Sequence, residues 1–318
     1  PALNPKQPAL PANYLPAHPF NNGDANVRDE VEVSGVWKNR DEATIRNEIG
    51  REFACNENID IQIGRVLEKL KANGTYTPLV MGTNDQWEAA TMGFQNIGPN
   101  YWKGEEGRKA LIDGSQKLTD KPYVDAFAAL AKWAPYMGDG YKAQTYPDSQ
   151  NLFGLGKGAI YAAGSWDIST FRAQNVNMGA FKAPPPAGAS DCYISDHTDI
   201  GIGLNAKSPN SEEAKKFLDW VGSEEFANLY ANALPGFFPL SNAKVTLSDD
   251  VAQEFVNWRG TCKSTIRNSY QILSRGTPNL ENEMWNVSAQ VLNGTMQPDA
   301  AAAQLEDGLK KWYAPHQK

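Results

Sequence analysis

From about residue 60 onward, apolar residues recur at helix and strand spacings, with polar residues between them. The stretch RVLEKLKANG (65–74) predicts an amphipathic helix that stops at a glycine, and YTPLVMG (76–82) follows as a short buried strand. YVDAFAALAKWAPYM (123–137) is typical of a second amphipathic helix. The apolar side chains that define the two helix faces are Val66, Leu67, Leu70, Phe127, Leu130 and Trp133.

The second half of the chain repeats this alternation. Residues 201–234 predict a strand and then two helices, of which the first begins at Asn210 with Glu213 as the partner of a capping box. Ser223 is the expected cap of the second helix, and a last helix begins at Pro298. The predicted apolar faces hold Ala214, Phe217, Leu218, Val221, Phe226, Leu229, Tyr230, Leu305, Leu309 and Trp312. Short strands that alternate with helices predict an α/β protein.

The first 28 residues break the pattern, because their six prolines exclude a regular helix. A short strand is suggested at 31–37, and an apolar helical face at 45–53. The length of 318 residues suits two domains or lobes. No apolar run approaches the roughly 18 residues that cross a bilayer. No signal peptide opens the chain, and we expect any export signal to have been removed.

Charge and cysteine content narrow the possible partners. The net charge is −7 and no basic stripe occurs, so nucleic acid and anionic membranes are poor partners. The cysteines, Cys55, Cys192 and Cys262, lack zinc spacing. An exported protein could hold one disulfide among them, but the sequence does not choose the pair.

Common catalytic motifs are missing. AGSWD lacks the second glycine of a nucleophile elbow, and GLGKGA (154–159) fits neither a P-loop nor a dinucleotide fingerprint. The three histidines lie too far apart in sequence for a helical metal pair, so a zinc or Ser-His site is not expected. Paired carboxylates would suffice for a glycosidase, which leaves a carbohydrate-active enzyme as an alternative function. The candidates for such a pair are Asp85, Glu88, Asp167, Asp191, Asp196 and Asp199.

Four segments resemble the extracellular solute-binding proteins of ABC sugar importers, the maltose-binding-protein-like family. They are EKLKANGTYTPLVMGTNDQWEAATMGF, LFGLGKGAIYAAGSWDIS, DIGIGLNAKSPNSEEAKKFLDWVGSEEF and NLENEMWNVSAQVLNGTMQPDAAAAQLEDGLKKWY. The resemblance implies a two-lobed, type II α/β fold with a hinge and an interlobe cleft. Lobe one would comprise residues 1–56 and 185–235, and lobe two residues 57–184 and 236–318. The proline-rich head departs from the family pattern, which leaves the lobe-one ligand contacts undefined.

The resemblance also implies where a ligand binds. In the maltose-binding branch, the tryptophan after the apolar run stacks on the sugar, and Trp166 of GAIYAAGSWDISTF occupies that place. The matching aromatic positions after the buried strand and before the Asn-Gly turn are Trp87 and Trp285. Indole faces pack on the C–H face of a pyranose ring. The tryptophans interpreted as core instead are Trp102, Trp133, Trp220 and Trp312.

Polar groups are expected around these indoles, because sugar hydroxyl groups need hydrogen-bond partners. Lobe two offers three kinds of group: acids next to the tryptophans, the turn PGFF, and an arginine. Lobe one offers the segment SDHTD. The predicted polar and turn residues are Asp85, Ser165, Asp167, Asp196, His197, Gly236, Phe237 and Arg275.

The sequence thus predicts a receptor that captures a sugar or sugar derivative, acidic derivatives included, in an interlobe cleft, closes on it and delivers it to a membrane permease of an ABC importer. We expect a monomer with no cofactor, no metal and no catalytic residue. Its location would be periplasmic or extracellular, with a lipid anchor if the source is Gram-positive. Besides the enzyme, a chemosensory role, in which a receptor reads the closed form, is a further alternative.

Overall fold

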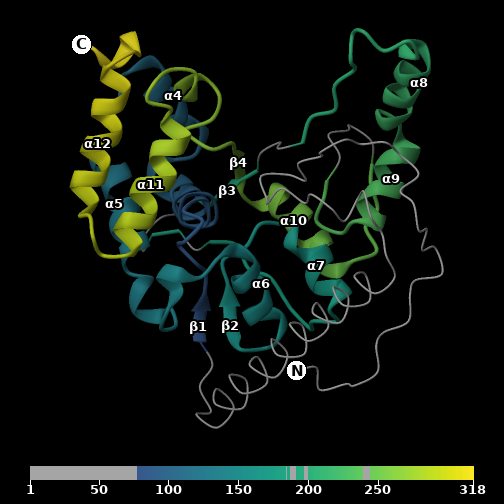
Figure 1. Cartoon of the computed structure of the whole chain (residues 1–318), viewed down its shortest axis with the longest axis horizontal. Helices are drawn as coiled ribbons and strands as arrows, with labels where there is room; N and C mark the ends of the chain where they lie inside the picture. The colour runs from purple at the N-terminus through teal and green to yellow at the C-terminus, as the bar shows by residue number, and fades with distance from the viewer. Residues whose placement is uncertain (1–76, 184, 187–190, 197–199, 239–243) are drawn as a thin grey trace, which may run out of the picture. The chain divides into compact units, whose positions relative to one another are not determined.

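The computed structural model describes residues 77–183, 185–186, 191–196, 200–238 and 244–318 (Figure 1). These residues belong to one of two compact units of the chain, Tyr76–Lys318. The predictions for the proline-rich head, for the strand and helix at 31–53 and for the helix that ends at Gly74 lie outside the described residues, as does Cys55.

Several of the predicted site residues lie directly after two parallel strands. β1 (Thr77–Val80) pairs with β2 (Gly158–Tyr161), and Leu79 lies opposite Ile160. Leu79 also forms a parallel bridge to Met137, which therefore lies on the other edge of β1. Parallel strands need a crossover between them, and helices supply it here. The predicted strand at 76–82 is confirmed.

A helical layer packs around a core of buried apolar side chains. After β1 come η1 (Ala89–Phe94, a π-helix), α2 (Gln95–Ile97), α3 (Pro99–Trp102), α4 (Glu105–Asp113) and α5 (Lys121–Ala131). From the end of the chain, α11 (Leu280–Leu292) packs on η1, and α12 (Pro298–Lys310) packs on α5 and α11. The fully buried side chains include Phe94, Phe127, Leu130, Met284, Leu292 and Leu305.

The helix predicted at 123–137 is shorter in the structure. It ends at Ala131, and a 3-10 turn (Ala134–Tyr136) follows. Pro135 lacks an amide hydrogen and restricts the residue before it, which explains the early end. Trp133 is therefore half-buried rather than core, whereas the core placement of Trp102 is confirmed at 3% exposure.

A second parallel pair lies between β3 (Tyr193–Ser195) and β4 (Lys263–Thr265). A disulfide joins Cys192 to Cys262, the residues that immediately precede the two strands. This is the pairing that the sequence left open. A crosslink that closes a loop of this length contributes about 4 kcal/mol to stability in the chain-entropy model. α10 (Asp250–Thr261) leads into β4.

The two helices predicted at 210–234 are confirmed as α8 (Ser211–Val221) and α9 (Glu224–Ala233). Ser223 accepts a hydrogen bond from the amide of Phe226, as expected of a cap. Asn210 precedes α8 but its side chain makes no capping bond, and residues 201–205 form no strand, so both of those predictions were wrong.

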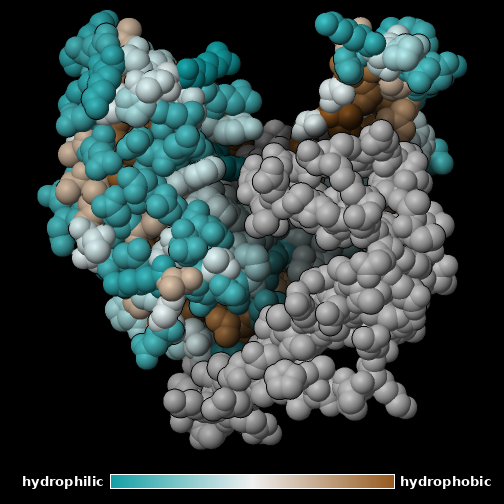
Figure 2. All heavy atoms as spheres, viewed as in Figure 1, coloured by the Kyte–Doolittle hydropathy of each residue, from teal (hydrophilic) through white to brown (hydrophobic). Residues whose placement is uncertain are grey.

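The apolar face predicted for α8 is not buried within the described part of the chain. Phe217 is 52% exposed, and no residue of α8 is fully buried. Instead the aromatic rings of α8 and α9 contact one another, with Trp220 against Phe217 and Phe226, and Phe226 against Tyr230. Figure 2 shows hydrophobic residues gathered over these two helices.

The end of the chain is held by a buried histidine. His316, in the last 3-10 turn (Ala314–His316), places Nδ1 2.9 Å from Glu306 Oε1 and Nε2 2.6 Å from the carbonyl oxygen of Leu111. Glu306 also accepts from the amide of Leu118. The pair therefore joins the C-terminus to α4 and α12.

Candidate functional site

Trp166 lies at the start of α7 (Asp167–Ala173), directly after the loop that follows β2. The indole lies across Gly164, because a Cβ atom on that glycine would be only 2.2 Å from the ring. The side chain is half-buried, and its N–H donates to the hydroxyl group of Tyr146 at 2.7 Å. Trp166 is thus held in place by both a backbone surface and a hydrogen bond.

Tyr146 joins four of the residues that the sequence predicted for the site. It is the first residue of α6 (Tyr146–Gly154), a helix that begins with a capping box between Thr145 and Asp148. Its ring contacts Trp87 edge to face, with the centroids 4.9 Å apart. Its hydroxyl accepts from Trp166 and donates to Asp167 Oδ1, and its backbone N–H donates to Asp85 Oδ2 at 2.8 Å. We call Asp85, Trp87, Tyr146, Trp166 and Asp167 the Tyr146 cluster.

The sequence reasoning missed Tyr146. No periodicity marks it, because it lies at a helix start rather than on an apolar face, and its partners are 20 to 61 residues away in the chain. The capping pattern TYPD was the only local signal, and it indicates a helix start rather than a function. Parallel pairing of β1 with β2 brings the loops after both strands together, and this brings Asp85 and Trp87 near Trp166.

Two buried acids lie among these residues. Asp167, at 1% exposure, accepts a second hydrogen bond from Gln150 Nε2 at 2.7 Å. Glu88, at 0% exposure, accepts from the hydroxyl of Ser149 at 3.1 Å. Burial raises the pKa of the Asp167 carboxyl, against the effect of its hydrogen bonds. Burial likewise raises the pKa of Glu88, to about 8, and the charges of Asp85 and Asp167 add to that effect. Both acids are among those that the sequence offered as candidates for a glycosidase pair, and both are buried.

Trp285, the third predicted indole, lies on α11 in a separate polar group. Its N–H donates to Glu281 Oε1 at 3.3 Å, and Glu281 forms an ion pair with Arg267 at 2.6 Å. Trp285 packs against the same apolar core as Trp87 and Trp166. No described hydrogen bond or ring contact joins it to the Tyr146 cluster.

The PGFF turn passes directly beside the loop of Trp166. Gly236 has a φ of +96°, and a Cβ atom there would be 1.8 Å from the carbonyl oxygen of Ser165. Only glycine allows this approach. The structure therefore brings Ser165 and Gly236 together, as the predicted site requires. The ring of Phe237 contacts Tyr230, with centroids 6.4 Å apart.

The remaining predicted residues are not brought to the cluster by any described contact. Asp196 forms a two-pronged ion pair with Arg259 of α10, at 2.7 and 2.8 Å. Arg275 is exposed on the loop after the 3-10 turn Ile272–Ser274. His197 and Asp199 lie outside the described residues. Asp191 pairs with Lys263.

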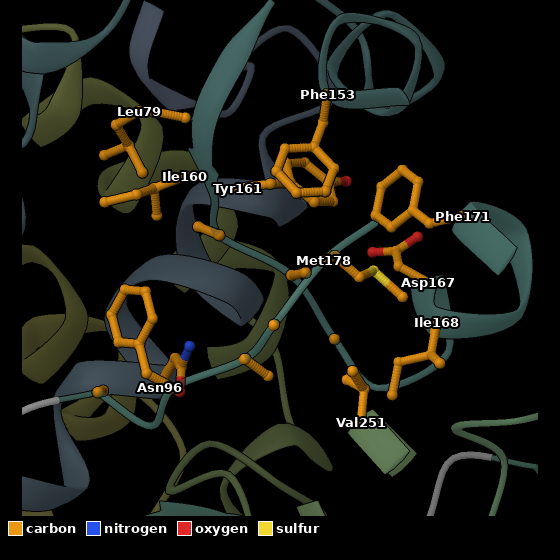
Figure 3. A pocket seen from close by; sticks show the side chains of 18 of the residues that line it. Leu79, Asn96, Phe153, Ile160, Tyr161, Asp167, Ile168, Phe171, Met178 and Val251 are labelled. Atoms are coloured by element: carbon orange, nitrogen blue, oxygen red, sulfur yellow. The ribbon is translucent and has the colours of Figure 1, made fainter. Parts of the chain in front are cut away.

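An apolar cavity of about 410 Å³ lies between β2 and residues 178–183 (Figure 3). The sticks in Figure 3 show Ile160 and Tyr161 from β2, Met178 from the facing segment, and Phe171 from α7 around it. Asp167 also lines this cavity, so the cavity borders the Tyr146 cluster at this residue. Within the described residues, no group of three histidine, cysteine, aspartate or glutamate side chains is placed to hold a metal ion.

Comparison with known proteins places the chain in a family. A model of bacterial extracellular solute-binding proteins matches residues 6–228. The chain belongs to this family. It is 26% identical over 253 residues to an uncharacterized ABC transporter extracellular-binding protein of Pyrococcus horikoshii. The match covers 77% of this chain and 51% of that protein.

Solved structures share the fold of this solute-binding protein. A chitin oligosaccharide binding protein superimposes with a TM-score of 0.65 at 19% identity, over 79% of this chain and 64% of the other. A sugar transporter protein of Bacillus licheniformis in complex with stachyose gives 0.54 at 16%, over 74% and 61%. A solute-binding protein in complex with raffinose gives 0.54 at 16%, over 80% and 65%. The chain spans about half to two thirds of the length of these relatives.

The α/β fold class of the two-lobed solute-binding proteins, predicted from the sequence, is confirmed by these likenesses. Membership of the solute-binding protein family implies a binding role rather than catalysis. The described part of the chain contains no helix that is both long and apolar enough to cross a membrane.

Proposed function

We propose that this chain is the ligand-binding component of an ABC importer and that it captures a sugar on the indoles of Trp87 and Trp166. The observation that carries this proposal is that both indoles contact Tyr146. Trp87 packs edge to face on its ring, and the N–H of Trp166 donates a hydrogen bond to its hydroxyl group. Two half-buried indoles from distant segments, each fixed by a neighbour, form a preorganised aromatic surface. We call these two indoles the platform.

Such a surface suits a pyranose ring. The C–H face of the sugar packs on an indole, and its hydroxyl groups need acceptors and donors at the edge of the contact. Asp85 and Gln150 are half-buried polar side chains of the same neighbourhood. The likeness to proteins described as binding chitin oligosaccharide, stachyose and raffinose supports a sugar as the ligand.

The proposal extends to residues that the described contacts leave apart from the cluster. Trp285 would supply a third stacking surface, and Gly236 and Phe237 the edge of the cleft, with Arg275, Asp196 and His197 as more distant polar contacts. Lobe one would hold residues 1–56 and 185–235, and lobe two residues 57–184 and 236–318. The protein would act as a monomer outside the cytoplasmic membrane, without a cofactor, and deliver its ligand to the permease.

An enzymatic role receives less support from the acids of the site. Asp167 and Glu88 are fully buried, so of these three acids only the half-buried Asp85 can reach a bound sugar, whereas a glycosidase needs a pair. The bound sugar should therefore be released unchanged.

The decisive experiment is a binding screen over neutral, amino and acidic oligosaccharides, read by calorimetry, with the ligand recovered afterwards and analysed by mass spectrometry. We expect saturable binding of at least one sugar and recovery of the intact molecule. Steady release of a cleaved product would favour the enzyme instead, and a complete lack of sugar binding would refute the proposal.

A further inference from the structure

Three acids lie around Tyr146, and no base accompanies them in the described part of the chain. Asp85 accepts the backbone N–H of Tyr146, Glu88 the hydroxyl of Ser149, and Asp167 the amide of Gln150. No described lysine or arginine forms an ion pair with any of the three. The described ion pairs join acids elsewhere in the chain, such as Glu105, Asp196, Asp249 and Glu281.

The lack of a counter-charge affects how these acids ionise. Because Glu88 has a pKa of about 8, it keeps its proton at neutral pH. The charges of Asp85 and Asp167 both contribute to that shift, which indicates that the region already carries negative potential. An additional negative charge at the platform would therefore meet repulsion, and a positive charge would relieve it.

Two oxygens of this group have no hydrogen-bond partner among the described residues. They are Glu88 Oε2 and Asp167 Oδ2, both on fully buried side chains. The hydroxyl of Tyr161 lies near enough to Asp167 to favour its ionised form, but no hydrogen bond of ordinary geometry joins it to Oδ2. Asp167 also lines the cavity between β2 and residues 178–183 (Figure 3), but Oδ2 itself is buried, so the charge of Asp167 acts on a ligand through space rather than by direct contact.

We infer that the platform selects sugars by the sign of their charge, rejecting sugars that carry a carboxylate or phosphate and preferring amino sugars with a free ammonium group over their uncharged counterparts. The inference rests on the proposed function and specifies its ligand class. It revises the expectation from the sequence that the ligand could be an acidic sugar derivative. Arg275, the arginine predicted for the site, makes no described contact with the cluster.

The aromatic surface strengthens the same preference. An ammonium group over the face of an indole is attracted by the electrons of the ring, and tryptophan is the best of the aromatic residues for this contact. Asp85 is half-buried beside Trp87 and can pair with the same ammonium group. An acetamido group in place of the ammonium carries no charge and should lose this advantage.

Calorimetry with matched oligosaccharides tests the inference on the full chain. The probes are sets of equal length that differ only in one substituent (hydroxyl, ammonium, acetamido or carboxylate), built on β-1,4-glucan, α-1,4-glucan and α-galactoside backbones. At about pH 6 the sugar amine is protonated. We expect the ammonium form to bind at least about threefold more tightly than the hydroxyl form, and the carboxylate form at least about tenfold more weakly, with both differences shrinking in high salt.

Two variants distinguish the local electrostatic effect of the cluster acids from the effect of the net charge of the protein. Asp85→Asn keeps the shape and removes one negative charge, so the preference for the ammonium form should fall. Asp219→Asn makes the same charge change on the exposed surface of α8 and should leave the preference as it is. Equal affinity for the charged and uncharged forms of a sugar that binds, or tighter binding of the carboxylate form, overturns this inference but leaves the proposed function standing. Failure of every sugar to bind overturns the proposed function and the inference with it.

Discussion

The hydroxyl group of Tyr146 accepts the indole N–H of Trp166 and donates its own hydrogen to Asp167, the next residue in the chain. One side chain from the start of α6 thereby fixes both the orientation of a platform indole and the position of the buried acid beneath it. The arrangement makes the geometry of Trp166 dependent on a residue 20 positions away.

We predict that Tyr146→Phe weakens sugar binding about tenfold. The phenyl ring keeps the edge contact with Trp87, but the hydrogen bonds to Trp166 and Asp167 are lost, at a cost of about 1–3 kcal/mol in stability. Ligand titration measures the affinity and denaturant unfolding measures the stability. The tryptophan emission spectrum reports whether the surroundings of the Trp166 indole have changed. The control is Tyr313→Phe, which loses a comparable hydrogen bond, to Ile112, outside the cluster. It should cost stability without changing affinity. A Tyr146→Phe protein with unaltered affinity and emission would contradict the positioning role.

Trp166→Ala should reduce binding by about 1–3 kcal/mol, by analogy with the stacking of bases on aromatic side chains. That corresponds to about one to two decades in the dissociation constant. Because the indole is half-buried, the loss of unfolding free energy should stay below the 3–5 kcal/mol of a fully buried tryptophan. Trp220→Ala on α8 is the matched control for binding. Strong destabilisation with unchanged affinity would mean that Trp166 is a core residue.

Gly164→Ala should impair the site without removing any functional group. The new methyl group would lie 2.2 Å from the indole of Trp166 and must displace it, so affinity should fall about as far as in Trp166→Ala. Gly201→Ala adds the same methyl group where no atom lies within 4 Å and should be silent. The comparison of the two titrations checks this, and normal affinity in Gly164→Ala would show that the indole can move aside without consequence.

Glu88 should make the stability of the protein depend on pH. Its pKa is raised from 4.5 to about 8 by burial, so its contribution to stability is fully present below about pH 4.5 and is lost as the pH rises through 8. Glu88→Gln carries no titrating group and should flatten this decline, becoming more stable than the parent above about pH 8. Urea unfolding from pH 5 to 9 measures the effect. Glu254→Gln, exposed on α10, should keep the parental pH profile, and identical profiles for Glu88→Gln and the parent would contradict the assignment.

His316→Ala should destabilise the protein by about 3–5 kcal/mol, because it leaves the buried Glu306 carboxylate without its histidine partner. Ligand affinity of the folded protein should be unchanged, since the pair lies at the C-terminus. Thermal unfolding and ligand titration separate the two effects. The neighbouring exposed Gln317→Ala should unfold like the parent. Equal melting temperatures for both variants would show that the pair contributes nothing.

Local signals in the sequence predicted the local elements well. The strand at β1, the Ser223 cap of α9, the start of α12 at Pro298 and the amphipathic faces of α5 and α12 are properties of short stretches, and the structure bears them out. What failed depends on distant partners: among the described residues, 201–205 have no neighbouring strand to pair with, and no described core covers the face of α8.

The difference between local signals and contacts between distant segments also explains how much of the site could be predicted from the sequence. The resemblance to the solute-binding proteins pointed to Trp87 and Trp166, and Asp85 and Asp167 were named because they adjoin these indoles in the chain. The sequence could not show that all four contact Tyr146, because that depends on the register of β1 against β2. Nor could it show that Glu88 and Asp167 are buried, since burial is decided by helices from other parts of the chain.

The bond between Cys192 and Cys262 turns the intervening segment into a closed loop of 70 residues that leaves and returns at one point. α8, α9 and α10 all lie within that loop. A protease that cuts the exposed chain around residues 200–210 therefore cannot release a fragment: the two pieces stay tied together and migrate as one band until a reductant is added. In an oxidising environment, a nicked molecule would keep β3 and β4 side by side and could retain its ligand-binding loops intact.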